Sequence, residues 1–199
     1  MRGAVLAGGA ARRYGGQPKG LLELGGRRIL DRVVDAVQAA TGEPPLLVAN
    51  AADATAWRPD LRTVPDLRPG AGSLGGILTA VAAAPTPVLC VAWDMPFVTT
   101  DLLTALVTGS AAWDVFLPES DGRRGVEPLC AVYGPACRAP IERQLAQDEL
   151  RAIGFHAAVR VGRLALERVR EFGAPETLFF NVNTPEDLER AEALWRRRG

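Results

Sequence analysis

Histidine and cysteine are scarce in this sequence, and their scarcity limits the chemistry that the chain can perform. Its 199 residues include one histidine, His156, and three cysteines, Cys90, Cys130 and Cys137. No two cysteines form a CxxC pair, so a zinc site built from cysteine and histidine is nearly excluded. No GxSxG motif is present, and a Ser-His-Asp triad would have to use His156. We expect buried thiols at Cys90 and Cys130, because both fall within stretches that predict strands.

An excess of charge of one sign and a long apolar run are also absent. The 23 basic and 23 acidic side chains give a formal net charge of zero, which argues against a nucleic-acid partner. No stretch approaches the ~20 apolar residues of a membrane span, and the first residues do not resemble a signal peptide. We therefore expect a cytoplasmic protein that has no membrane partner. A chain of this length can form one domain without disulfides or a structural metal.

Apolar strands and amphipathic helices alternate along the chain. The apolar stretches predict strands at 3–7, 44–50, 62–66, 86–96, 113–118 and 126–133, and the stretch FFNVNTPEDLERAEALW predicts a strand, a turn and a helix. Helices are expected at 30–41, 73–85 with Ser73 as N-cap, 99–109, from 135 past Glu149, and from Pro185 after a Thr184 cap. This order predicts a three-layer α/β fold, with helices on both faces of a mostly parallel, Rossmann-like sheet. Such sheets bind ligands beyond the carboxyl ends of their strands.

The stretch GGAARRYGGQPKG follows the first predicted strand. Glycines let backbone N–H groups approach a phosphate closely, although the spacing matches neither Walker A nor GxGxxG. Lys19 is the only lysine among the 23 basic residues. A compact ammonium can follow a phosphate, whereas a planar guanidinium does not replace it freely. Arg13 or its neighbour Arg12 can supply a second cation. A flexible turn and a chance lysine are the alternatives.

Three polar residues stand at the ends of predicted strands. Asp94 follows the apolar run VLCVAW, where a carboxylate could bind Mg²⁺ together with substrate phosphates. Asp66 could accept hydrogen bonds from a nucleobase or ribose, and Asn50 offers both a donor and an acceptor. A capping or turn role is the alternative for Asp94, and a turn with Pro69 for Asp66.

Five stretches together resemble a known family. LAGGAARRYGGQPKGLLELGG is similar to the signature loop of nucleotidyltransferases built on a Rossmann-like sheet. GAGSLGGILTAV, AWDMPFVTTDLL, VEPLCAVY and FFNVNTPEDLERAE resemble, in the same order, motifs of the molybdenum cofactor guanylyltransferase (MobA) family. The first loop is shared with sugar-phosphate and methylerythritol-type transferases. The NVNTPEDL ending and the short chain favour the molybdopterin branch.

The resemblance implies a fold of the nucleotide-diphospho-sugar transferase type and a single nucleotidyltransferase domain over residues 1–199. Its N-terminal half would bind the nucleotide and its C-terminal half mainly the second substrate. The implied reaction transfers GMP from GTP to the terminal phosphate of molybdopterin, with Mg²⁺ as cofactor and release of pyrophosphate. Molybdoenzymes or their chaperones would be further partners.

The resemblance also implies roles for individual residues. The nucleotide would be contacted by Leu6, Ala7, Gly8 and Gly9, its phosphates by Arg13 and Lys19, the nucleoside by Asn50 and Asp66, Mg²⁺ by Asp94, and the pterin side by Asn181 and Asn183. A tight turn before the last helix is the alternative for the asparagine pair. Lys19, Arg13 and Asp94 would be the catalytic residues.

The sequence departs from the family pattern at Pro18, where aspartate is common, and at Tyr14, where methionine is common. Cytidylyltransferases of molybdopterin share the glycine loop, the lysine and the aspartate. We favour guanine because its N–H donors suit an acceptor such as Asp66. Another small nucleotidyltransferase and a non-catalytic nucleotide-binding adaptor are the other interpretations. The polar turn at 119–125 is a candidate flap over the substrate.

Overall fold

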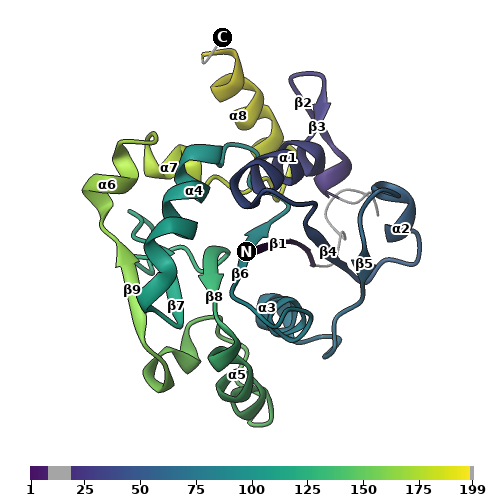
Figure 1. Cartoon of the computed structure of the whole chain (residues 1–199). Coiled ribbons are helices and arrows are strands. Elements are labelled where there is room, and N and C mark those ends of the chain that lie inside the picture. The colour runs from purple at the N-terminus through teal and green to yellow at the C-terminus, as the bar shows by residue number, and fades with distance from the viewer. Residues whose placement is uncertain (9–18, 198–199) are drawn as a thin grey trace.

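A computed structural model gives the fold and describes residues 1–8 and 19–197 (Figure 1). Within these residues, a seven-stranded sheet has the order β5-β4-β1-β6-β8-β7-β9. Its strands are β1 (Arg2–Ala7), β4 (Leu46–Ala49), β5 (Thr63–Val64), β6 (Val88–Ala92), β7 (Val115–Pro118), β8 (Cys130–Tyr133) and β9 (Val161–Leu164). A small hairpin is formed by β2 (Glu23–Leu24) and β3 (Arg27–Arg28).

Strand direction divides this sheet into two halves. Strands β5, β4, β1 and β6 run parallel to one another. Strand β8 is antiparallel to both of its neighbours, β6 and β7, while β7 and β9 are parallel. The prediction of a mostly parallel sheet is confirmed, and β8 is its exception. The carboxyl ends of the parallel strands and the amino end of β8 therefore lie along one edge.

Helices cover both faces, which confirms the three-layer prediction (Figure 1). The helices are α1 (Ile29–Thr41), α2 (Ala54–Trp57), α3 (Gly72–Ala82), α4 (Thr100–Gly109), α5 (Arg138–Leu145), α6 (Leu166–Arg170), α7 (Pro175–Leu178) and α8 (Pro185–Arg196), with 3₁₀ turns η1 (Lys19–Leu21), η2 (Ser110–Ala112), η3 (Pro135–Cys137) and η4 (Gly154–Ala158). Successive strand side chains point to opposite faces. In β1, Val5 packs in the apolar cluster that contains α1 and α4, and Leu6 in the cluster that contains α3 and α5.

The end of α1 and the start of α8 lie where the local chemistry predicts. Helix α1 buries Val33, Val34 and Val37 at helical spacing and ends at Gly42, whose φ of 80° suits glycine. Helix α8 starts with a capping box in which the Thr184 hydroxyl accepts from the Asp187 N–H. The part of the chain that the structure describes contains no helix long and apolar enough to cross a membrane.

Three local predictions are wrong. Helix α3 begins at Gly72 without a side-chain cap, so Ser73 lies inside its first turn. Helix α5 ends at Leu145 and does not continue past Glu149, because the Gln144 amide instead donates to the Glu149 and Arg151 carbonyls at 3.1 and 2.8 Å. The strand predicted at the start of FFNVNTPEDLERAEALW does not form, because no strand lies between Phe179 and α8. The prediction of buried thiols at Cys90 and Cys130 is confirmed, and Cys137 is also buried.

Candidate active site

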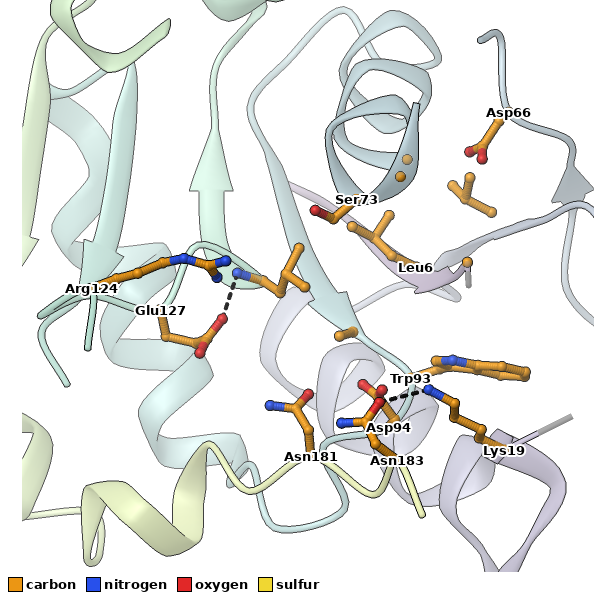
Figure 2. Close-up of a pocket in the computed structure, with 16 residues that line it drawn as sticks. Leu6, Lys19, Asp66, Ser73, Trp93, Asp94, Arg124, Glu127, Asn181 and Asn183 are labelled. Atoms are coloured by element: carbon orange, nitrogen blue, oxygen red, sulfur yellow. Dashed lines mark hydrogen bonds between the residues drawn. The ribbon is translucent and has the colours of Figure 1, made fainter. Parts of the chain in front are cut away.

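A cavity of about 370 Å³ opens at the edge of the sheet where the parallel strands end (Figure 2). Strands β1, β4 and β6, helix α3, the β7–β8 hairpin and the segment before α8 all contribute to its wall. The lining residues are Leu6, Gly8, Lys19, Val48, Asp66, Gly72, Ser73, Gly76, Ala92, Trp93, Asp94, Arg124, Glu127, Leu129, Asn181 and Asn183. The structure thus brings together groups that are far apart in the sequence.

One end of the cavity carries Asp66, which is held by Asn50. The side-chain amide of Asn50 donates to the Asp66 carboxylate at 2.7 Å. The backbone N–H of Asp66 donates back to the side-chain oxygen Oδ1 of Asn50, also at 2.7 Å. Burial raises the pKa of Asp66, and the bond from Asn50 partly opposes that rise. Asn50 itself does not line the cavity. The first of these bonds holds the Asp66 carboxylate, which lies beside Gly76 in the cavity wall.

The predicted backbone contacts at the end of β1 divide into three groups. Leu6 and Gly8 line the cavity, and the Leu6 carbonyl accepts the Trp93 N–H at 3.2 Å. Ala7 points to the opposite face of the sheet, where its side chain packs in the core with α1. Gly9 and Arg13 lie outside the described residues.

Lys19 and Asp94 occupy the middle of the cavity. The Lys19 ammonium donates to the side-chain amide oxygen Oδ1 of Asn183 at 2.6 Å, although 164 positions separate the two residues (Figure 2). Burial raises the pKa of Asp94, against the opposing attraction of the Lys19 charge. The Asp94 backbone carbonyl accepts the Val182 N–H at 2.9 Å. This bond places the segment before α8 beside the end of β6.

The asparagine pair is positioned by the start of α8. The Asn183 N–H donates to the Asp187 carboxylate at 3.0 Å, as part of the same cap that fixes Thr184. The Asn181 amide donates to the Phe179 carbonyl at 3.0 Å. The backbone of Asn183 therefore has the structural role that the alternative of a turn before the last helix predicts. The side chains of both asparagines line the cavity.

The other end of the cavity carries Glu127 and Arg124, which the sequence interpretation did not select. Leu129 donates its N–H to one Glu127 carboxylate oxygen at 3.0 Å. Burial raises the pKa of Glu127, and so does the nearby Asp94 charge, while the Leu129 bond and Arg124 lower it. Both residues come from the polar turn ahead of β8. An acidic residue directly before the apolar stretch PLCAVY was the available signal, although the sequence pattern placed Glu127 inside the predicted strand 126–133.

The single histidine takes no part in this cavity. His156 lies on η4 with its ring edge-on to Phe155. Burial, with a contribution from Arg163, lowers the pKa of His156 to about 4. Its imidazole is therefore neutral at physiological pH, and it is not among the residues that line the cavity.

The cavity suits a metal ion that the substrate helps to bind. The described residues contain no group of three or more His, Cys, Asp or Glu side chains arranged for a metal. Asp94 offers a half-buried carboxylate, and Asn181 and Asn183 offer amide oxygens. Mg²⁺ commonly binds through one or two carboxylates plus substrate phosphates and water. The donors present therefore fit a hard divalent cation that arrives with a nucleotide.

A sheet of this order, with a lysine and an aspartate at the ligand edge, defines a nucleotidyltransferase of the Rossmann-like type, and residues 3–161 match the model of the MobA-like NTP transferase domain. The chain is 37% identical to a probable molybdenum cofactor guanylyltransferase of Pelotomaculum thermopropionicum, over 96% of this chain and 92% of that protein. It is 35% identical to a molybdenum cofactor guanylyltransferase of Desulfosudis oleivorans, over 97% and 95%. The chain belongs to the molybdenum cofactor guanylyltransferase family, as its motifs suggest.

Solved structures agree with this assignment. The crystal structure of molybdopterin-guanine dinucleotide biosynthesis protein A from Archaeoglobus fulgidus superposes with a TM-score of 0.82 at 29% identity, covering 99% of this chain and 100% of that one. A 4-diphosphocytidyl-2C-methyl-D-erythritol synthase from Anaerococcus prevotii superposes with a TM-score of 0.73 at 15% identity. The second similarity shows only that the fold is shared. The predicted nucleotidyltransferase fold is confirmed.

Proposed function

We propose that this protein transfers GMP from GTP to the terminal phosphate of molybdopterin, releasing pyrophosphate and forming a guanine dinucleotide cofactor. The observation that carries the proposal is a single cavity that brings Asp66, Lys19 and Asp94 together. The Asp66 carboxylate, a hydrogen-bond acceptor, lies at one end, and Lys19 lies beside Asp94 in the middle. Relatives that cover nearly the whole chain are named molybdenum cofactor guanylyltransferases, which supports the choice of substrates.

The reaction requires positioning more than proton transfer. The attacking phosphate oxygen is already anionic at neutral pH, so no general base is needed, and the neutral His156 away from the cavity is consistent with that. Lys19 would neutralise nucleotide phosphates and hold them in line for attack. Alignment of this kind can lower a barrier by up to about 7–11 kcal/mol. Arg13, outside the described residues, stays a predicted second cation.

A divalent metal is the expected cofactor for a transferase of this family, and we propose Mg²⁺. Asp94 would hold it, with Asn181 and Asn183 within the same part of the cavity. When bound, the ion would neutralise charge on the reacting phosphates. The remaining work of this end of the cavity belongs to Lys19, whose ammonium Asn183 holds toward the phosphate path.

Asp66 is the proposed reader of the base. Guanine presents N1–H and N2–H₂ as donors, and a carboxylate accepts both. Asn50 would act as a positioning residue, because its amide and carbonyl are both engaged with Asp66. Contacts from Leu6, Ala7, Gly8 and Gly9 to the nucleotide stay predictions, as do the division of one domain into nucleotide and substrate halves, a molybdoenzyme or chaperone partner, and a cytoplasmic location.

Calorimetric titration with GTP and with CTP, each in the presence of Mg²⁺, tests the proposal first. We expect clear preference for GTP, followed by pyrophosphate release when molybdopterin is added under anaerobic conditions. Preference for CTP would assign the chain to cytidylyl transfer. Binding of neither nucleotide would contradict the proposed activity.

A further inference from the structure

We propose that Arg124, whose side chain extends into the cavity beside Glu127, binds the phosphate of the acceptor substrate opposite the nucleotide. The inference rests on the proposed function and adds a residue that contacts the second substrate. The chemical class it recognises is a phosphate monoester on a bulky heterocyclic molecule. The roles already assigned to Lys19, Asp94 and Asp66 do not depend on it.

Arg124 lies at the wall of the cavity. It stands in the turn between β7 and β8, where the Ser120 N–H bonds to the Gly125 carbonyl at 3.0 Å and the Glu127 N–H to the Pro118 carbonyl at 3.0 Å. The Glu119–Val126 bridge closes the same turn. These bonds form a defined hairpin at the ligand edge. Figure 2 shows the Arg124 side chain reaching from this hairpin toward Glu127 and the cavity.

Two acidic residues of the hairpin already pair with other arginines. Arg163 lies 3.9 Å from Glu119, and Arg170 lies 3.4 Å from Asp121. Within the described residues, Arg124 forms neither a hydrogen bond nor an ion pair, and it faces the cavity instead. Glu127 is its nearby countercharge, since the two side chains lie next to each other at the cavity wall (Figure 2). An exposed guanidinium in this setting is available to bind a phosphate.

The in-line geometry of the proposed reaction also favours this side of the cavity for the acceptor. Displacement at phosphorus places the attacking oxygen and the leaving group roughly in line on opposite sides. If the nucleoside binds at Asp66 and its phosphates reach Lys19 and Asp94, the acceptor must approach from the side away from Asp66. Arg124 and Glu127 line that side of the cavity (Figure 2). Among the described lining residues, Lys19 and Arg124 are the cations. Each would then bind one anionic substrate, Lys19 the nucleotide and Arg124 the acceptor.

Glu127 has a positioning role in this scheme. Its carboxylate is fixed by the Leu129 N–H at 3.0 Å, so its charge remains at the cavity wall and attracts Arg124 inward. Replacing Glu127 with glutamine keeps an oxygen for that N–H but removes the charge. The effect of E127Q on the acceptor should therefore depend on Arg124 being present.

The test compares Arg124→Ala with Arg124→Lys and with Arg123→Ala on the same turn. Arg123 is exposed and does not line the cavity, so it controls for loss of a positive charge from the hairpin. Initial rates are measured anaerobically with GTP and Mg²⁺ while the concentration of molybdopterin is varied. We expect the KM for molybdopterin to rise about 10- to 100-fold in R124A, as loss of a charge-assisted hydrogen bond predicts. R124K should recover part of that loss, and R123A should match the wild type.

Binding of GTP separates this role from its main competitor. If Arg124 instead holds the departing pyrophosphate, R124A will weaken calorimetric binding of GTP, and that result would overturn the proposal. An unchanged KM for molybdopterin would also overturn it. In the double variant R124A/E127Q, the glutamine should add no further effect on KM, whereas an additive effect would remove Glu127 from the scheme. A wild-type chain that forms no dinucleotide would overturn the proposed function itself, a result distinct from an active wild type with unaffected R124A.

Discussion

The two halves of the sheet present their polar residues to the cavity in opposite ways. In the parallel half, formed by β5, β4, β1 and β6, Asn50, Asp66 and Asp94 follow the strands that position them. In the mixed half, β8 runs the other way, and Arg124 and Glu127 precede it. Residues that follow a strand and residues that precede a strand can therefore lie at the same edge of a sheet, when the two strands run in opposite directions.

The halves also differ in how their carboxylates are accompanied. Asp66 is paired with a neutral amide, which leaves an anionic group suited to the N–H donors of a base. Glu127 stands near an arginine, and that arginine is the cation that we propose binds the acceptor phosphate. Asp94 and Lys19 lie between the two ends. We therefore expect substitutions in the middle to affect turnover, and substitutions at either end to affect one substrate each.

The largest effect is expected from Asp94→Asn. Removing the carboxylate charge at the end of β6 should lower Mg²⁺-dependent turnover about 1,000-fold, equivalent to about 4 kcal/mol. Turnover measured across a Mg²⁺ titration provides the test, and a thermal unfolding curve controls for folding. A variant that remains active at ordinary Mg²⁺ concentration would remove Asp94 from the metal site and the middle of the cavity from the comparison.

Lys19→Ala should have the next largest effect. The ammonium is expected to stabilise the phosphates as charge shifts during transfer, so its loss should lower kcat about 100-fold. The melting temperature should change little, because the side chain is partly exposed. Asn183→Ala is the informative companion, since it removes the 2.6 Å partner while keeping the cation. Turnover in K19A equal to that of the wild type would contradict the phosphate role.

Sequence reasoning worked well where chemistry follows an apolar strand. The runs before Asn50 and Asp94 predicted both the strand and the edge at which its last residue would lie, and Lys19 was conspicuous as the only lysine. Glu127 and Arg124 were not predicted as site residues, because an apolar run has the same pattern whether its strand is parallel or antiparallel. Direction is set by pairing with β6 and β7, which no local pattern records.

The segment before α8 illustrates the opposite error. Its alternation of Phe180, Asn181, Val182 and Asn183 is typical of a strand, yet the backbone forms none. Val182 donates instead to the carbonyl of Asp94, outside the sheet ladder, and Asn183 joins the cap of α8. Asn181 and Asn183 line the cavity, but tertiary hydrogen bonds determine the backbone of this segment.

Gly76→Ala tests the nucleotide end with a change smaller than any charge removal. A Cβ there would lie 3.6 Å from Leu6 and 3.8 Å from Asp66, which are ordinary contacts, and alanine favours a helix by about 1 kcal/mol. The fold should therefore be kept or stabilised. A methyl group on the binding wall should nevertheless weaken GTP binding roughly tenfold, within the ~1–3 kcal/mol of overpacking, while the KM for molybdopterin is unchanged.

Gly75→Ala is the matched control for this prediction. Its Cβ would meet the Ala71 Cβ at 2.9 Å and the Arg68 carbonyl at 3.0 Å, and Gly75 does not line the cavity. This variant should lose stability. Calorimetry with GTP and thermal unfolding distinguish the two outcomes. If G76A raised the KM for molybdopterin and spared GTP, the assignment of the two ends would be reversed.

The smallest expected effect is on stability, in Glu127→Gln. Burial raises the pKa of Glu127, so the folded state binds a proton there more readily than the unfolded chain does. The charged carboxylate therefore costs stability, a cost that is absent below the ordinary glutamate pKa of about 4.3 and grows as pH rises through the folded value. Glutamine removes the charge and keeps an acceptor for Leu129. We expect the melting temperature to rise by about 2–4 °C at pH 7, the shift that about 1 kcal/mol produces in a chain of this size, and the gain to vanish near pH 4.

Glu119→Gln on the same hairpin gives the contrast. Glu119 accepts the Leu166 N–H at 3.0 Å and lies 3.9 Å from Arg163, outside the cavity, so neutralising it should not stabilise the fold. A gain at Glu127 alone, paired with a higher KM for molybdopterin, would mean that the mixed half keeps a destabilising charge because the acceptor substrate requires it. Equal melting temperatures for E127Q and the wild type across this pH range would mean that burial imposes no such cost, and the two ends of the cavity would then differ in ligand alone.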